Sequence, residues 1–383
     1  MAFILNEEQL IIKETIRDFV QKECPRETVR EMEETQTIPF DLWHKLAELG
    51  FLGLTIPEDY GGEGINYLGG LITIEELSRI FPSFALTYIG SAFTGGGIIA
   101  ALGDENQKQG YLEKLTGGDL FFSTALAEEE AGFKTEGLKT IAELNGGKII
   151  VNGSKNSVSS AGFANHLVVL VRSGDQDDLE ANFSVLIIDV NSPGVELIKK
   201  NKIGMKSAGS YEVNFNQVNV PAASILGGSA CYNRGAEQLP FIFDLQNLAY
   251  AACRLGIADG AYEYARNHAH ERVQFGLPII EFNAIKKMLV ELAVEIDACR
   301  LLVYRAGNLA DAGKPFSLEA AMAASSAMRL AKNAVSRGIQ VCGGYGYALE
   351  YDAQRYWRDA FAAPFDGQTA ETIDKRTALL AGL

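Results

Sequence analysis

The spacing of hydrophobic and polar positions changes twice along the chain, which indicates three structural units. In the first 118 residues, apolar side chains recur every three or four positions, the period of amphipathic helices. The segments with this period are 10–20, 40–51, 69–81 and 104–116. Asn6 is expected to cap the first helix, because Gln9 follows it at the capping-box spacing. Residues 1–118 are therefore predicted to form an N-terminal α-helical domain.

Short runs rich in β-branched and aromatic residues replace this pattern over 119–228, and Gly, Asn, Asp and Ser separate them. Such runs predict strands, so this part is expected to form a middle β-domain. The runs are 120–125, 149–151, 166–171, 183–190 and 211–220. In the last run the apolar parity changes after Phe215, which predicts a β-bulge near Gln217. Asn152 and Gly153 stand between apolar runs and predict a hairpin turn.

The helical period returns in long alanine-rich segments from residue 229 onward. These segments are 234–271, 282–312 and 316–341, and they predict a helical bundle over 229–383. The chain therefore belongs to a mainly α fold class with a central β-domain, without the βαβ alternation of a doubly wound sheet. The run Gly343-Gly-Tyr-Gly follows a predicted helix and not a strand. It is therefore not expected to be the nucleotide-binding turn of a doubly wound fold.

Composition narrows the possible partners and the compartment. With 34 Lys and Arg against 49 Asp and Glu, the net charge of −15 argues against nucleic acid as a partner. The five cysteines are widely spaced and form no CxxC pair, which indicates reduced thiols and a cytoplasmic protein. The four histidines show no zinc-ligand spacing, so no metal is expected. No apolar run approaches the roughly 18 residues of a membrane span, so no span is expected either.

Four segments carry a family resemblance when they are taken in order. They are 123–132 (S-T-A-L-A-E-E-E-A-G), 144–161, 202–227 and 271–283. The last, E-R-V-Q-F-G-L-P-I-I-E-F-N, is the most specific, and Q-V-C-G-G-Y-G-Y at 340–347 and Arg358-Asp359 follow it. Together they resemble the acyl-CoA dehydrogenase family of FAD flavoproteins over essentially the whole chain.

The resemblance implies a fold, a reaction and partners. The fold would be an N-terminal helical domain, a middle β-barrel-like domain and a C-terminal four-helix bundle, assembled as a homotetramer that is a dimer of dimers. In this family a carboxylate removes the α-proton of an acyl-CoA substrate, while the β-hydrogen leaves as hydride to flavin N5. An electron-transferring flavoprotein would then reoxidise the bound FAD.

The resemblance also implies site residues. Arg272 is expected to contact the FAD pyrophosphate of a neighbouring subunit, and Phe275 to lie against the cofactor. The full set of implied FAD contacts is Leu126, Ala127, Gly132, Ser157, Ser159, Arg272, Gln274, Phe275, Gln340, Gly343, Gly344, Thr369 and Glu371. The implied substrate contacts are Phe133, Lys134, Asp244, Gln246, Asn247 and Gly367.

Two alignments of the segment after Arg358 disagree about the catalytic base. Matching its aromatic-acid-glycine pattern puts Asp366 at the base. Counting without gaps puts Gly367 there instead, and the usual Glu is then missing. The branch of the family that takes its base from a third-domain helix offers no substitute, because Gln246 stands at that position.

Three hypotheses about function therefore follow. The first is an FAD-dependent acyl-CoA dehydrogenase that uses Asp366 and acts on an unusual acyl group, which would be branched, alicyclic or carboxylated. The alternative is the same flavoprotein scaffold without ordinary α,β-dehydrogenation, such as a CoA-thioester desulfinase or lyase, or a 1,4-dehydrogenase of an alicyclic CoA ester. The third is a helical assembly protein that has lost catalysis.

Overall fold

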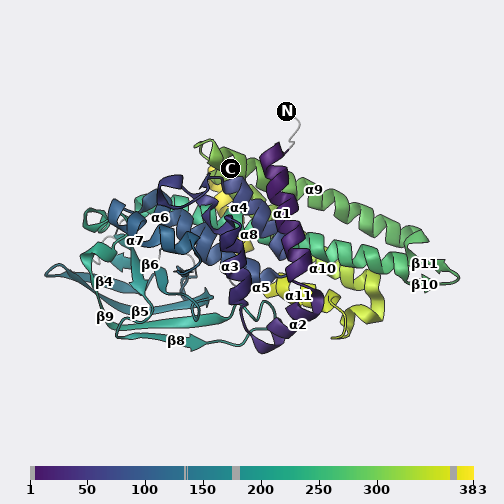
Figure 1. Ribbon diagram of the computed structural model, residues 1–383, viewed down its shortest axis with the longest axis horizontal. Coiled ribbons are helices and arrows are strands. Elements are labelled where there is room, and N and C mark those ends of the chain that lie inside the picture. The colour runs from purple at the N-terminus through teal and green to yellow at the C-terminus, as the bar shows by residue number, and fades with distance from the viewer. Residues whose placement is uncertain (1–4, 133–134, 136, 175–181, 363–368) are drawn as a thin grey trace.

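The predicted fold class is confirmed: helices, one β-sheet and further helices follow each other along the chain (Figure 1). The computed structural model describes residues 5–132, 135, 137–174, 182–362 and 369–383. The β-domain occupies one end of the molecule, and an arm of long helices projects at the other end. The helices of the first and last thirds of the chain pack together between these two ends.

The N-terminal part is helical, as expected. Its helices are α1 (Glu7–Glu23), α2 (Arg26–Thr35), α3 (Phe40–Glu48), α4 (Tyr67–Ser78), α5 (Pro82–Tyr88), the π-helix η3 (Ile89–Gly96), α6 (Gly97–Leu102) and α7 (Glu105–Thr116); the short strands β1 (Thr55–Ile56) and β2 (Gly64–Ile65) pair with each other. The capping box is confirmed, because the Gln9 amide nitrogen donates to Asn6 Oδ1 at 2.8 Å and the Asn6 amide nitrogen donates to Gln9 Oε1 at 3.0 Å.

The stretch 82–102 corrects the expectation that no segment resembles a membrane span. By length and apolar composition it could cross a membrane, but 78% of its 18-residue window is buried inside the protein. It is apolar on all sides because it lies in the core, and for the same reason it has no amphipathic period that would have predicted it.

The middle part forms one curled sheet of seven described strands. The strands are β3 (Phe122–Ala125), β4 (Ile141–Asn145), β5 (Lys148–Ser159), β6 (His166–Ser173), β7 (Phe183–Asp189), β8 (Val195–Lys199) and β9 (Ser210–Pro221). Their order is β3-β6-β4-β5-β9-β8, and β7 pairs with β6. Both β3 and β4 run parallel to β6, whereas the other pairs are antiparallel. The pattern missed β4 and β8, whose side chains are mostly exposed.

The predicted bulge is confirmed, but the predicted turn is wrong. The register between β5 and β9 shifts between Val151 and Gly153, and Gln217 opposite has φ 51°. Asn152 and Gly153 therefore lie inside β5, where a side chain at Gly153 would stand 2.5 Å from the Thr140 Cα. The turn between β4 and β5 lies instead at 146–147, where two glycines adopt φ 58° and 82°. These angles suit the two-residue turn of a right-twisted hairpin.

The C-terminal part contains the expected long helices. They are α8 (Gly235–Glu271), α9 (Asn283–Asp311) and α10 (Ser317–Cys342), followed by the shorter α11 (Ala353–Ala362) and α12 (Ala370–Leu380); the strands β10 (Val273–Gln274) and β11 (Leu277–Pro278) form a hairpin between α8 and α9. This hairpin lies at the tip of the arm (Figure 1).

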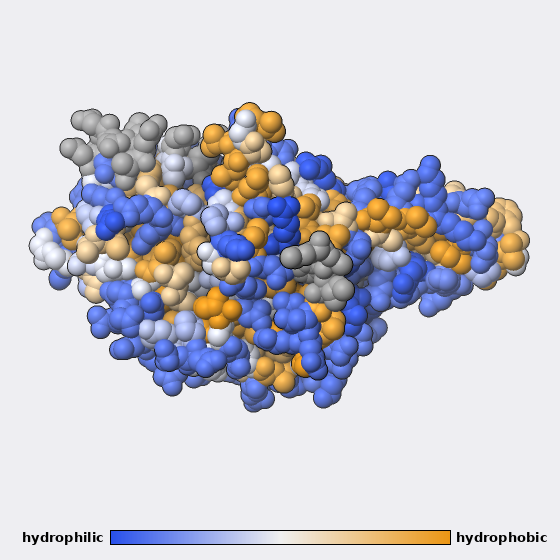
Figure 2. Space-filling view, turned by 90° about the horizontal axis from the view of Figure 1, so that it is seen from above, coloured by the Kyte–Doolittle hydropathy of each residue, from blue (hydrophilic) through white to orange (hydrophobic). Residues whose placement is uncertain are grey.

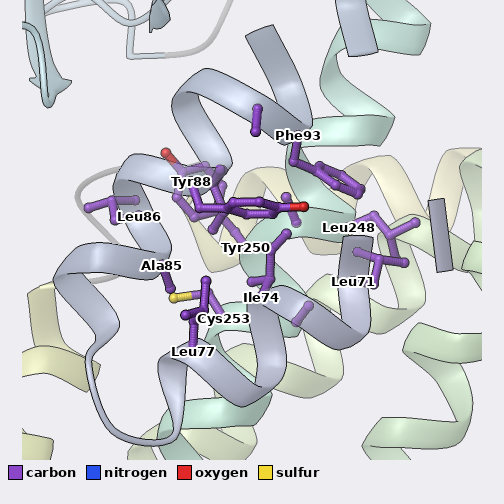
Figure 3. Packing of buried hydrophobic residues seen from close by; sticks show 14 of the residues in the cluster. Leu71, Ile74, Leu77, Ala85, Leu86, Tyr88, Phe93, Leu248, Tyr250 and Cys253 are labelled. Carbon is purple, nitrogen blue, oxygen red and sulfur yellow. The ribbon is translucent and has the colours of Figure 1, made fainter. Parts of the chain in front are cut away.

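The main hydrophobic core joins the two helical parts. Figure 3 shows Leu71 and Ile74 of α4 beside Tyr88 of α5 and Leu248 of α8, and all four side chains are buried. Every residue of α4 is buried. The central helix therefore packs against neighbours on all sides, which explains its low polar content.

Two adjacent carboxylates on α4 are buried and need ionic partners. Glu75 accepts hydrogen bonds from Arg300 Nε at 2.8 Å and from the Tyr304 hydroxyl at 2.7 Å, both on α9. Glu76 accepts one from Arg17 Nη2 of α1 at 2.8 Å. Burial alone would raise the pKa of Glu76, but Arg17 and two further cations outweigh it and hold the pKa below its usual value. These contacts fix α1 and α9 on α4.

A second polar cluster holds the β-domain against the helices. Asp359 of α11 accepts a hydrogen bond from the Met205 amide at 2.7 Å, and Arg358 donates to the Ile203 carbonyl at 2.7 Å. Gly204 lies so close that an added Cβ would stand 2.4 Å from the Arg358 carbonyl oxygen. The Arg358-Asp359 pair of the sequence motif therefore anchors the segment that leads into β9.

We expect Glu75→Leu to lower the free energy of unfolding by about 3 kcal/mol or more, because it leaves the Arg300 guanidinium largely buried without one of its carboxylates. Denaturant unfolding followed by circular dichroism measures the change. Lys287→Met is the control, since it removes only an exposed pair with Glu291 at 3.9 Å and should leave the unfolding midpoint unchanged. Equal midpoints for the Glu75 variant and the wild type would contradict the structural role of the carboxylate.

Candidate active site

A cleft lies where the β-domain meets helices α5, η3 and α8. Its lining residues are Leu86, Gly90, Ser123, Thr124, Leu126, Ala127, Asn156, Ser157, Ser159, Gln246 and Tyr250. Leu86 and Tyr250, both labelled in Figure 3, belong to the hydrophobic core and also line the cleft, so the core forms part of the cleft wall. The structure thus brings together five residues that the sequence assigned to FAD or substrate: Leu126, Ala127, Ser157, Ser159 and Gln246.

The β-side of the cleft owes its shape to an irregular stretch of β5. The pairing with β9 shifts between Lys155 and Val158, and Ser157 adopts φ 55°. The Asn156 side chain stabilises this conformation by accepting a hydrogen bond from the Ser157 amide at 2.8 Å. The Asn156 amide in turn donates to the Ala127 carbonyl at 2.9 Å. Backbone and hydroxyl groups therefore face the cleft here.

Helix α8 forms the opposite wall with Gln246 and Tyr250, and Asn247 is buried next to them in the sequence. Gln246 is 5% exposed and lines the cleft, and no described residue forms a hydrogen bond with its side chain. Asn247 is 4% exposed, and its Nδ2 has no hydrogen-bond partner among the described residues. An unsatisfied buried polar group costs about 1–3 kcal/mol, so the Asn247 amide indicates a polar ligand or water in this region. Tyr250, which the sequence analysis missed, follows Gln246 at the i+4 spacing of one helix face.

Asp244 lies two positions before Gln246 on α8 but does not line the cleft. Its buried carboxylate accepts hydrogen bonds from Ser317 of α10 and from Arg376 Nη2 of α12, the latter at 2.5 Å. Burial raises the pKa of Asp244, and these two partners offset part of the rise. Sequence reasoning missed Arg376, because nothing local relates it to a residue 132 positions earlier. The contact fixes α12 beside the cleft helix.

The loop after β3 closes on itself. The Glu128 amide donates to the Gly132 carbonyl at 3.0 Å, and the Gly132 amide donates back to the Glu128 carbonyl at 2.8 Å. Gly132 has φ 58°, which favours glycine. Phe133, Lys134, Asp366 and Gly367 lie outside the described residues.

Thr369 and Glu371 lie on the surface at the start of α12. Thr369 caps this helix by accepting a hydrogen bond from the Thr372 amide at 3.2 Å. Glu371 pairs with Lys375 at 2.7 Å, and both side chains are largely exposed. Neither residue lines the cleft of the single chain.

The remaining predicted FAD contacts gather at the tip of the arm. Arg272 ends α8, and its guanidinium lies 5.1 Å from the centre of the Tyr345 ring. Phe275 has φ 50° and is 93% exposed at the β10–β11 turn. Gln340, Gly343 and Gly344 lie at the end of α10 and are exposed as well.

One chain does not join the two groups of predicted FAD contacts into a single site. Gln246 and Arg272 lie on the same helix, and the 26 residues between these positions correspond to about 39 Å at 1.5 Å per residue. A single dinucleotide does not span this distance. The cleft and the arm can therefore contribute to one FAD only if they come from different subunits.

A helical, a β and a second helical part that meet around one cleft define the architecture of the chain, and family comparisons identify its class. Residues 6–119 match the N-terminal domain of acyl-CoA dehydrogenases, residues 123–218 the middle domain and residues 233–371 the C-terminal domain. The chain therefore belongs to the acyl-CoA dehydrogenase family, whose members are FAD-dependent oxidoreductases.

Individual relatives cover nearly the whole chain. A probable acyl-CoA dehydrogenase of Bacillus subtilis is 34% identical over 94% of both chains. The CarC subunit of the caffeyl-CoA reductase–Etf complex of Acetobacterium woodii is 32% identical over 92% of this chain and 93% of its own. The structure of butyryl-CoA dehydrogenase from Megasphaera elsdenii superposes with a TM-score of 0.94 over the full length of both chains, at 30% identity.

The chemistry of the cleft fits a flavin ring. None of the described lining residues carries a formal charge, and the β-side presents hydroxyl and backbone groups that can hydrogen-bond to neutral ring nitrogen and oxygen atoms. Ser159 keeps a hydroxyl at its predicted flavin position, whereas Ser157 offers no aromatic ring for stacking. Leu126, Ala127 and Ser159 would hold the ring, and Arg272 of another subunit would hold phosphate.

We expect Arg376→Met to loosen α12, because Asp244 then keeps only Ser317 as a described side-chain partner. Hydrogen exchange followed by mass spectrometry should show faster exchange of amides 370–380 than in the wild type. Lys375→Met on the same helix is the matched control, since its partner Glu371 is exposed. Unchanged exchange in Arg376→Met would show that the ion pair does not hold the helix.

Proposed function

We propose that this protein is an FAD-dependent acyl-CoA dehydrogenase in which the Asp366 carboxylate removes the α-proton of the substrate. Bound FAD would accept the β-hydrogen as hydride at N5, which leaves an α,β-unsaturated thioester. The protein residues bind the thioester, exclude water and hold the proton on one carboxylate oxygen.

The observation that carries the proposal is the absence of any carboxylate among the described residues that line the cleft. Proton removal needs a base, and the neutral Gln246 amide is not one. Asp366 is the single acid among the seven residues, 363–369, between α11 and α12. Helix α12 directly follows this connection, and Arg376 ties the helix to Asp244, only two positions before Gln246.

The acyl group is proposed to be unusual, either branched, alicyclic or carboxylated. The buried Gln246 amide supports a polar substituent, because an unsubstituted alkyl chain would leave its hydrogen-bonding groups unsatisfied. Gly367, Asn247, Phe133 and Lys134 remain proposed substrate contacts on the family resemblance.

The alternative is a relative that does not perform ordinary α,β-dehydrogenation, such as a desulfinase, a lyase or a 1,4-dehydrogenase of alicyclic esters. The same observation keeps it open, since the described cleft contains no base at the position that other branches use. The two functions differ in whether an acyl-CoA reduces the flavin.

We further propose a cytoplasmic homotetramer that passes electrons to an electron-transferring flavoprotein. The Etf-complex subunit among the relatives supports this acceptor. Figure 2 shows hydrophobic side chains along the projecting arm, where Val290 and Val294 of α9 are 62% and 64% exposed. Together with Phe275, they form an apolar surface that suits contact with further copies of the chain.

Anaerobic mixing of the yellow protein with a panel of straight, branched, alicyclic and carboxylated acyl-CoA esters should bleach the flavin band with at least one ester. Asp366→Asn should retain FAD and lose bleaching by about 100-fold or more, because no base then takes the proton. Gln246→Glu, added to Asp366→Asn, should restore part of the rate by placing a carboxylate in the cleft.

The control for this experiment is Asp374→Asn, which neutralises a half-exposed acid of α12 and should bleach normally. Unchanged bleaching in Asp366→Asn would contradict its role as base. Yellow protein that no ester bleaches would favour the alternative function, and protein that binds no FAD would contradict both.

Light scattering should give the mass of four chains for the wild type. Val294→Asp should shift the protein to smaller species, because it places a charge on the apolar face of α9. Leu144→Asp, at an exposed apolar site of the β-domain, should remain tetrameric. A tetrameric Val294→Asp variant would contradict assembly through this face.

A further inference from the structure

A buried ion pair lies directly behind the β-side wall of the cleft. The Lys155 side chain is completely buried, and its Nζ lies 2.8 Å from Glu128 Oε1 and 3.4 Å from the Leu126 carbonyl oxygen. Both partners are neighbours of cleft residues: Lys155 precedes Asn156 and Ser157, and Glu128 follows Ala127. The family resemblance assigned neither of them to FAD or to substrate.

Glu128 connects three segments of backbone. Its carboxylate accepts hydrogen bonds from the Lys139 amide at 2.7 Å and from the Thr140 amide at 3.0 Å, next to the start of β4. Its own backbone closes the loop with Gly132. The carboxylate thus links the loop after β3 to β5 and to the entry of β4.

Burial and pairing act in opposite directions on both side chains. Burial lowers the pKa of Lys155 to about 8, and Glu128 opposes the fall. For Glu128, burial would raise the pKa, but Lys155 and the two amides outweigh it and hold the pKa below its usual value. Each side chain therefore favours the charged form of the other.

Stability alone does not account for a buried ion pair. Replacing such a pair with apolar side chains of similar volume is often neutral or stabilising, because desolvation opposes the attraction between the charges. A directional contact does, however, fix the separation of the segments it joins. Here those segments are 126–128 and 155–157, which together form the wall of the cleft.

We propose that Lys155 and Glu128 are a positioning pair that holds these two segments at the separation that FAD binding requires. This inference rests on the proposed FAD binding. The two buried side chains increase FAD affinity through the neighbouring backbone, without contacting the cofactor themselves.

The test is titration of apoprotein with FAD, followed by flavin absorbance, together with thermal unfolding of the apoprotein. Lys155→Met should weaken FAD binding by about tenfold or more and also lower the melting temperature, because it leaves Glu128 buried without its cation. The double variant Lys155→Met with Glu128→Leu should recover the melting temperature but keep the weakened affinity. Its flavin band should also differ in shape from that of the wild type.

Lys139→Met is the matched control, because it removes a lysine that pairs with the exposed Glu130 beside the same loop, and it should bind FAD as the wild type does. A double variant that recovers wild-type affinity together with stability would reduce the pair to a structural role, as would a Lys155→Met variant with unchanged affinity. Wild-type protein that binds no FAD would instead contradict the proposed function itself.

Discussion

The burial of helix α4 on all sides is the constraint on which the rest of the structure depends. Its twelve residues are inaccessible to solvent, and two of them are carboxylates. Apolar contacts bring α5 and α8 against it, whereas Glu75 and Glu76 require cations from α1 and α9. A buried carboxylate without a partner is strongly destabilising, so the positions of these outer helices are determined with little freedom.

This packing also places the cleft. Helix α8 lies against α4, and two positions on opposite sides of the helix contribute Leu248 to the core and Gln246 to the cleft. The β-domain reaches this helix through the anchoring of Met205 to Asp359, and its irregular strand β5 then forms the opposite wall. The ion pairs of Glu75 and Glu76 therefore act together with the Arg358-Asp359 contacts. The two clusters determine where the cleft lies, and so where a ligand can bind.

Beyond the cleft, helix α8 forms part of the projecting arm. From the cleft, α8 runs for many turns to Arg272, beyond the reach of any ligand held in the cleft of its own chain. Its exposed apolar residues and the aromatic tip lie where another subunit could cover them. Helix α8 thus connects the cleft of one chain to an exposed apolar surface that suits contact with a neighbouring subunit.

Sequence patterns predicted the features that depend on residues close in the chain. The capping box of Asn6 and Gln9, the long helices and the bulge at Gln217 each follow from neighbours within a few positions. The motifs 123–132 and 271–283 identified the family for a similar reason, because each is a short run with a fixed spacing. The hairpin turn was misplaced, since Asn152-Gly153 is a good local signal that the pairing of β5 with β9 overrides.

The sequence by itself thus determined the fold class, the order of the helices and strands and the family, because periodicity and short motifs report local interactions. Only the tertiary structure decided which charges meet. Arg376 reaches Asp244 across 132 positions, and Lys155 reaches Glu128 across 27. Such pairs form because packing buries both partners in one place and removes water as their alternative, a condition that no local pattern records.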